Sequence, residues 1–194
     1  MNQASAVQAD SQGLKSRLVD VATELLVVPR AVKLPTMREI ASAAGVAPGA
    51  AYRHFASQDE LFMAVITHLF DSLEAALVEA AESSRGLRAT VRNVSLGYVE
   101  WGMQNPGGYQ LLFETTDDDE ILKLGLRPGS DLIEKLATRI APRGKPKPAH
   151  IEKLELLAAG LHGLVSLRIH KKGANWAQPI DGTVDALIRA IFRP

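Results

Sequence analysis

Cysteine is absent from this chain of 194 residues, which excludes disulfide bonds and thiolate metal sites. Long apolar runs are missing as well: no stretch of 18 consecutive apolar residues occurs, so the sequence predicts no membrane span. The first residues, MNQASAVQADSQG, lack the basic-then-apolar pattern of a secretory signal. We therefore expect a cytoplasmic protein without a membrane partner.

Net charge is also missing, because 22 lysine and arginine residues balance 22 aspartate and glutamate residues. A broad basic field therefore gives no support for nucleic-acid binding. Any affinity for DNA has to come from individually placed contacts and from helix dipoles. Apolar residues, in contrast, make up 46% of the chain, enough for one sizeable core or two modest ones.

Helical spacing of apolar residues dominates the chain, and neither the period-two alternation of strands nor an internal repeat is evident. A first helix is expected from Leu14 to near Pro29. The other main helices are expected over residues 57–83, 87–105, 130–140, 151–169 and 180–192, with a loop over 141–148. The sequence predicts an all-α protein with a small N-terminal module ahead of a larger helical domain.

The most informative stretch is TMREIASAAGVAPGAAYRHFASQDELF, residues 36–62. Thr36 and Glu39 have the spacing of a capping box at a helix start. Behind them, apolar residues recur at i, i+3, i+4 and i+7. Gly45 is the residue type expected just past the end of this helix, and Pro48 suits the first turn of the next one.

The second short helix has two predicted faces. Ala51 and Phe55, four residues apart, are expected to point inward. Ser57 and Glu60 have the spacing of a second capping box, where a further helix begins. The residues expected on the outer face are Pro48, Gly49, Tyr52 and Arg53. Two short helices across a tight turn predict a helix-turn-helix, whose second helix lies in the major groove of DNA.

This stretch resembles the DNA-binding signature of the TetR family of bacterial transcriptional regulators. The shared pattern is a Gly-Val turn, a short recognition helix ending in Tyr-x-His-Phe, and a Ser-capped next helix. The chain departs from that pattern at Ala47, Ala51 and Gln58, where the family often has Ser or Thr, Leu and Lys. The resemblance covers roughly residues 14–70. It implies a DNA-binding domain over residues 1–60 and an effector-binding and dimerisation domain over residues 61–194.

Residues of three kinds are predicted to contact DNA. The resemblance places Tyr52 and His54 at phosphates, although both could instead be packing residues. Arg38 and Arg53 are the candidates for guanine recognition, or else solvated helix charges. Small residues at the start of the second helix can meet thymine methyl groups or allow close backbone approach. The full set is Thr36, Arg38, Ala47, Pro48, Gly49, Ala50, Tyr52, Arg53, His54 and Gln58.

The C-terminal half resembles, less specifically, the ligand-binding domains of one TetR subgroup, in residues 98–113 and 161–167. By that resemblance, the helices over 151–170 and 180–192 form a four-helix dimer interface with a second copy. Independently, regularly spaced leucines offer a larger apolar face than a monomer leaves in water. The predicted interface residues are Leu154, Leu157, Leu161, Leu164, Leu167, Leu187 and Ile188.

Six residues are candidates to line a cavity for a small-molecule effector. An aromatic or methionine stripe at helical spacing is as commonly plain core, and a histidine there is more commonly bonded to a nearby carbonyl. The candidates are Tyr98, Trp101, Met103, Tyr109, Phe113 and His162.

Metal-binding and catalytic patterns are not evident. The acidic run over residues 117–120 is not an EF-hand, because Leu122 and Pro128 stand where Gly and Glu are required. A helix N-terminus, which favours negative charge, explains the run. The five histidines show no paired ligand spacing, and no Ser-His-Asp signature, Walker loop or G-x-G-x-x-G occurs. We therefore predict no metal, no cofactor and no enzymatic activity.

Together these patterns predict a homodimeric transcriptional repressor that leaves a near-palindromic operator when a small apolar or amphipathic ligand binds. Its expected partners are double-stranded operator DNA, the effector and a second copy of the chain. One alternative is an all-helical small-molecule binding protein without DNA binding, favoured by the neutral charge and by Ala47 and Gln58. Another is an enzyme built on a helical cavity, which needs a converging acid and base that the sequence does not show.

Overall fold

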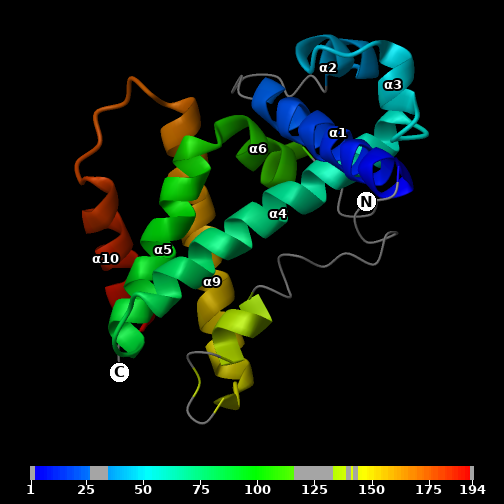
Figure 1. Cartoon of the computed structure of the whole chain (residues 1–194). Helices are drawn as coiled ribbons and strands as arrows, with labels where there is room; N and C mark the ends of the chain where they lie inside the picture. The colour runs from blue at the N-terminus through cyan, green and yellow to red at the C-terminus, as the bar shows by residue number, and fades with distance from the viewer. Residues whose placement is uncertain (1–2, 27–34, 116–132, 139–140, 142–143, 193–194) are drawn as a thin grey trace. The chain divides into compact units, whose positions relative to one another are not determined.

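The computed structural model describes residues 3–26, 35–115, 133–138, 141 and 144–192, and contains no strand within these ranges (Figure 1). The all-α prediction is confirmed. The helices are α1 (Gln3–Leu25), α2 (Met37–Ala43), α3 (Pro48–Tyr52), α4 (Gln58–Glu82), α5 (Leu87–Gln104), α6 (Pro106–Gln110), the π-helix η1 (Leu111–Thr115), α9 (Pro148–His170) and α10 (Ile180–Ile191). Residues 133–138 are also helical, whereas the acidic run over 117–120 lies outside the described residues.

Two predicted helix starts are wrong. Helix α1 begins at Gln3 rather than at Leu14. Helix α9 begins at Pro148 rather than at Ile151, because proline fits the first helical position, where its missing N–H has no partner to lose. The backbone N–H of Lys147, just before this helix, donates to Nδ1 of His150 at 3.1 Å.

The chain divides into two compact units, which are described separately. The first comprises Met1–Asp71 with Pro106–Thr115, and the second comprises Ser72–Asn105 with Thr116–Pro194. Helix α4 contributes to both units. Six of its buried residues recur every fourth position, and Phe62 and Ile66 are buried beside them; the six are Leu61, Val65, Leu69, Leu73, Leu77 and Ala81. This spacing forms a single apolar stripe along the helix.

Helix α4 is also the one described helix that is long and apolar enough, by length and composition, to cross a membrane. The sequence predicted no such segment. A core helix of a globular protein has the same composition, and the buried stripe of α4 accounts for it by packing within the fold.

In the first unit, α1, α2 and the start of α4 enclose a core of aliphatic side chains. Leu18 and Ala22 of α1 and Ile40 and Ala41 of α2 are fully buried. The segment Pro106–Thr115 belongs to this unit although it follows α5 in the sequence. Its Tyr109 is completely buried, and the Phe113 ring lies 4.8 Å from Tyr109 and 6.1 Å from Phe70 of α4 between centroids.

Gly108 lets this segment approach α4 closely. A Cβ atom at Gly108 would lie 2.6 Å from Cδ2 of Leu69, a buried side chain. The approach therefore depends on the absence of a side chain at this position.

In the second unit, α5, α9 and α10 pack against one another (Figure 1). Leu154, Leu157, Leu161 and Leu164 of α9 are buried inside this unit, as is Ile188 of α10. These residues therefore pack against helices of the same chain, whereas Leu167 of the predicted set is exposed; a dimer contact through them stays a prediction. The periodicity was real, but the cover comes from helices of the same chain.

We predict that Gly108→Ala destabilises the protein. Overpacking against Leu69 should lower the free energy of unfolding by about 1–3 kcal/mol, offset only in part by up to about 1 kcal/mol of helix propensity. Urea unfolding measures the difference. Gly13→Ala in α1, where a Cβ meets nothing within 4 Å, is the matched control and should be neutral or stabilising. Equal effects of the two substitutions would contradict the packing account.

Candidate nucleic-acid interface

Helix α2 starts with the predicted capping box. The Thr36 hydroxyl oxygen accepts a hydrogen bond from the backbone N–H of Glu39 at 3.3 Å. In return, the Thr36 N–H donates to the Glu39 carboxylate at 2.7 Å, and the Thr36 hydroxyl donates to the same oxygen at 2.8 Å. Two N–H groups that the helix leaves unpaired are thus satisfied.

The turn after α2 is held by a residue from another helix. Gly45 has a φ of 68°, which suits glycine. The Arg17 guanidinium of α1 donates to the carbonyl of Ala44 at the end of α2. A cation at a helix C-terminus also interacts favourably with the helix dipole. This contact was not predicted, because it joins residues 27 positions apart.

Helix α3 is only five residues long, and tertiary contacts hold it in place. Ala51 and Phe55 are buried, as predicted, and Ala50 is buried beside them. The ammonium group of Lys15 in α1 lies 5.1 Å from the centre of the Phe55 ring, a cation–π distance that the sequence did not indicate. Helix α3 is therefore fixed from its inner side by both α1 and the core.

The outer face of α3 is open, as predicted. Pro48, Gly49 and Arg53 are exposed, and 55% of Tyr52 is accessible. A Cβ atom at Gly49 would meet nothing within 4 Å, so this face could approach another molecule closely. Ala47 and Arg38 are exposed as well, whereas His54 is half-buried. The burial of Ala50 removes its methyl group from this face.

The start of α4 is fixed by further side-chain contacts. The Ser57 hydroxyl oxygen accepts from the N–H of Glu60 at 3.1 Å. The Glu60 carboxylate accepts from the N–H of Ala56 at 2.6 Å, one residue earlier than in a standard capping box. Gln58, predicted to contact DNA, donates its amide N–H to the carbonyl of Pro35 at 3.3 Å and so ties α4 to the residue before Thr36.

Two family models match the chain. The first, described as bacterial regulatory proteins of the tetR family, matches residues 32–65, which contain this helix-turn-helix. The second, described as a tetracyclin repressor-like C-terminal domain, matches residues 91–191, more than half of the chain. The chain belongs to the TetR family. The description of the first model makes this a family of bacterial regulatory proteins.

Individual TetR-type proteins are similar over part or all of the chain. The HTH-type transcriptional activator FasR of Mycolicibacterium smegmatis is 30% identical over 100 residues, which are 52% of this chain and 45% of FasR. The nucleoid occlusion factor SlmA of Haemophilus ducreyi is 25% identical over 109 residues, 53% of this chain and 54% of SlmA. The chain thus spans about half the length of the curated relatives that it matches.

Fold similarity extends further than sequence similarity. The crystal structure of a TetR-like transcriptional regulator from Rhodococcus sp. RHA1 superposes with a TM-score of 0.66 at 19% identity, covering 94% of this chain and 93% of that one. The TetR fold is therefore shared by both units of the chain.

The six residues predicted to line an effector cavity of this TetR-family protein are distributed over the two compact units. Tyr109 and Phe113 belong to the first unit, where they pack with Phe70. Met103 is exposed, because it lies on the outer side of α5. Tyr98, Trp101 and His162 belong to the second unit, where Trp101 is buried and donates its ring N–H to the Ser72 hydroxyl at 3.0 Å. Within the described residues, no three histidine, aspartate or glutamate side chains are grouped to hold a metal ion.

Ala47 is the departure from the TetR pattern with the clearest structural consequence. It occupies the N-cap of α3 without a side-chain hydrogen bond. We predict that Ala47→Ser raises the free energy of unfolding by about 1 kcal/mol, because a serine hydroxyl can accept from the first turn of the helix. Chemical denaturation followed by circular dichroism measures the change. The wild-type protein provides the comparison, and a serine variant no more stable than wild type would contradict the capping account.

Proposed function

We propose that this TetR-family regulator is a homodimeric, cytoplasmic repressor that leaves a near-palindromic operator when a small apolar or amphipathic ligand binds, and that it has no catalytic role. The observation that carries the DNA-binding part is the open outer face of α3, presented by a helix whose inner face is fully packed. Two such helices, one from each subunit, would enter successive major grooves about 34–36 Å apart.

The chemistry of the interface suggests which residue does what. Tyr52 and His54 can donate to phosphate oxygens and so position the protein on the duplex. Thr36 could do so only by releasing the hydrogen bond from its hydroxyl to the Glu39 carboxylate. Arg53, on the exposed end of α3, is suited to bidentate recognition of guanine, and Arg38 on α2 is the second candidate. Exposed residues at the start of α3 can meet thymine methyl groups or allow close backbone approach; they are Ala47, Pro48 and Gly49. Gln58 can share its amide with a phosphate only in addition to its bond with Pro35.

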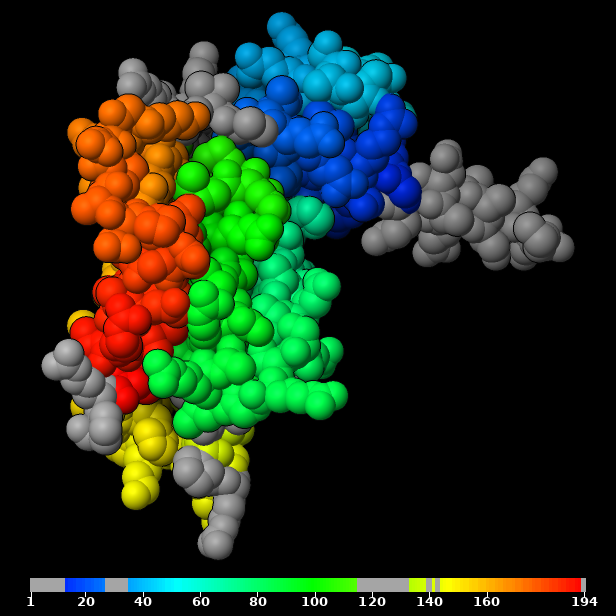
Figure 2. All heavy atoms as spheres, turned by 90° about the vertical axis from the view of Figure 1, so that its left-hand side faces the viewer, coloured from blue at the N-terminus to red at the C-terminus, as the bar shows by residue number. Residues whose placement is uncertain are grey.

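The proposed dimer uses the exposed side of α9, which includes Leu167 from the predicted set. Leu156 and Leu167 are the exposed leucines of this helix, with 60% and 48% of their surface accessible. They lie on one side of the helix with Gly163, where a Cβ atom would meet nothing within 4 Å. In the view of Figure 2, α10 (red) lies at the surface, and it packs against α9. These two helices would form a four-helix interface with a second copy.

Regulation by a ligand would act through helix α4, because this continuous helix contributes to both compact units. We propose residues 1–60 as the DNA-binding domain and residues 61–194 as the effector-binding and dimerisation domain. The proposed residues that would meet an effector are Tyr98, Trp101, Met103 and His162 in the second unit, and Tyr109 and Phe113 in the first. A coupling free energy of about 1–3 kcal/mol between the two sites would change operator affinity by about 5- to 150-fold.

Activation instead of repression is the second candidate. The name of the relative FasR describes a transcriptional activator. The two possibilities share the same protein–DNA interface, and they differ in where the operator lies relative to the promoter. Reporter expression with and without the regulator gene distinguishes them: repression predicts higher expression when the gene is deleted.

Substitutions on α3 separate positioning from sequence recognition. We predict that Tyr52→Phe combined with His54→Ala weakens binding to all duplexes by a similar factor, because phosphate contacts carry no sequence information. Arg53→Ala should instead relax the preference at one operator position, by about 1–3 kcal/mol. Mobility-shift titrations with the operator and with its single-base variants measure both effects.

Arg85→Ala, at an exposed arginine outside the helix-turn-helix, serves as the control for loss of charge and should leave the preferences unchanged. If Arg53→Ala kept every base preference, Arg53 would have no role in base recognition. A loss confined to one base pair in the Tyr52 and His54 variant would show that these residues read sequence instead.

The dimer face has its own test. We predict that Leu156→Glu with Leu167→Glu converts the protein to a monomer at micromolar concentration, because the contact would bury two carboxylates without partners. Sedimentation velocity measures the change. Leu87→Glu alters a leucine of similar exposure, 55%, at the start of α5, and should leave the dimer intact. An unchanged dimer in the double variant would place the interface elsewhere.

A further inference from the structure

Helix α10 is held against α5 and α9 mainly by apolar contacts. Val184 and Ile188 are buried, and Leu187 packs over Gly160 of α9, where an added Cβ atom would lie 3.0 Å from Leu187. Apolar contacts are strong but have little directional preference. They therefore explain why α10 packs against α5 and α9. They do not by themselves explain the position of α10 along its own axis.

The sequence of α10 repeats itself from one turn to the next. Ile180, Val184 and Ile188 follow at intervals of four, so a slide by one helical turn would replace one aliphatic side chain with another. Such a slide amounts to about 5.4 Å, and helices in switching proteins are known to move by this step. At these three positions, burial would be similar before and after the slide.

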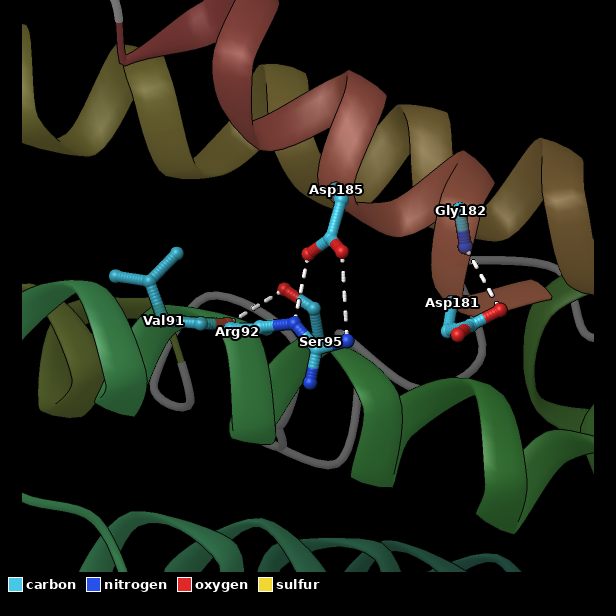
Figure 3. A network of polar contacts seen from close by, with 6 residues as sticks. All are labelled: Val91, Arg92, Ser95, Asp181, Gly182 and Asp185. Atoms are coloured by element: carbon cyan, nitrogen blue, oxygen red, sulfur yellow. Dashed lines mark hydrogen bonds and ion pairs between the residues drawn. The ribbon is translucent and has the colours of Figure 1, made fainter. Parts of the chain in front are cut away.

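A polar contact joins α10 to α5 at one point (Figure 3). The Arg92 Nε–H donates to Oδ1 of Asp185 at 2.7 Å, and Nη2 lies 3.4 Å from Oδ2, so the pair is bidentate. The hydrogen bond from Arg92 holds the pKa of the Asp185 carboxyl below its usual range. Both side chains are more than a third exposed, so the pair contributes little to overall stability. Its geometry, however, is specific to one position of the helix.

The charges that flank Asp185 penalise movement in one direction. Asp181, Asp185 and Arg189 also follow at intervals of four, and α5 and α10 run antiparallel (Figure 3). A one-turn slide toward the N-terminal end of α10 would bring Arg189 opposite Arg92. Two like charges would then replace the ion pair, which is unfavourable.

Movement in the other direction meets a different restraint. That slide would bring Asp181 opposite Arg92 and keep the charges matched, but it would pull α10 away from the loop before it. Arg168 of α9 holds this loop: its Nη2 donates to the carbonyl of Gln178 at 2.7 Å, and its guanidinium lies 4.6 Å from the centre of the Trp176 ring. The tie is next to Pro179, the N-cap of α10.

We propose that the Arg92–Asp185 pair and the Arg168 tie together fix the axial position of α10 on α5 and α9. Arg92 and Arg168 are thus positioning residues, in the way that single polar pairs fix register in other helical assemblies. This register has a functional consequence, which rests on the proposed function. The position of α10 would set how two subunits meet, and hence the distance between their recognition helices.

The absence of cysteine allows a direct measurement of this position. Spin labels attached at Met103→Cys on α5 and Ala190→Cys on α10, both exposed sites, report the separation of the two helices along their axes. Labelled protein is diluted with unlabelled protein, so that only distances within one subunit contribute. The wild-type protein carrying the two labels should give a single distance in pulsed electron paramagnetic resonance.

Arg92→Asp should produce a second population whose label distance is shorter by about 5.4 Å, because the introduced carboxylate repels Asp185 and attracts Arg189. Combining Arg92→Asp with Asp185→Arg should restore the single wild-type distance. Arg88→Asp makes the same charge change one turn away on α5 and should leave the distance unchanged. Arg92→Gln removes the pair without repulsion and should broaden the distribution.

A distance unchanged in both Arg92→Asp and Arg92→Gln would overturn the proposal, as would failure of the reversed pair to restore it. Should Arg92→Asp not fold, Arg92→Gln and the reversed pair still decide the outcome. The measurement needs neither DNA nor ligand. An unchanged label distance would therefore not contradict the proposed repressor function. A failure to bind an operator would not contradict the result on the position of α10.

Discussion

The inner face of α3 is the constraint on which the DNA-binding surface depends. A helix of five residues has no stability of its own in water, since helix nucleation is unfavourable. Burial of Ala51 and Phe55, with Lys15 over the Phe55 ring, holds α3 in place and leaves Tyr52 and Arg53 outside. The same packing makes the surface rigid, so that ordering this surface on DNA binding would cost little free energy. This matters for a chain without net charge, which has no broad basic field to add affinity.

Local features of the fold were predictable because they depend on residues close in sequence. The capping box of Thr36 and Glu39, the turn at Gly45 and the two faces of α3 all follow from spacings of four residues or fewer. Contacts between distant residues were not predictable. The Arg17 contact with Ala44 and the position of Lys15 over Phe55 depend on how α1 crosses the motif, which spacing does not encode.

The leucines of α9 show the same limit for surfaces. Their period correctly indicates an apolar face, but periodicity does not reveal whether the same chain or another copy covers it. Leu154 and Leu161 are covered by helices of the same chain, whereas Leu167, from the same predicted set, is exposed, as is Leu156. The aromatic candidates for the effector cavity show the same limit, because their spacing does not reveal which compact unit each one joins. Tyr109 packs with Phe113 in one unit, and Trp101 belongs to the other.

The most direct test is to select bound duplexes from a random pool with the purified protein at low ionic strength. It asks whether two copies of α3, one from each subunit, recognise two half-sites of DNA. The account predicts enrichment of an inverted repeat. The centres of its two half-sites should lie about 34–36 Å apart, which is about 10 base pairs, or at an operator-specific departure from that distance. Enrichment of a single unpaired half-site, or no enrichment over the starting pool, would contradict it.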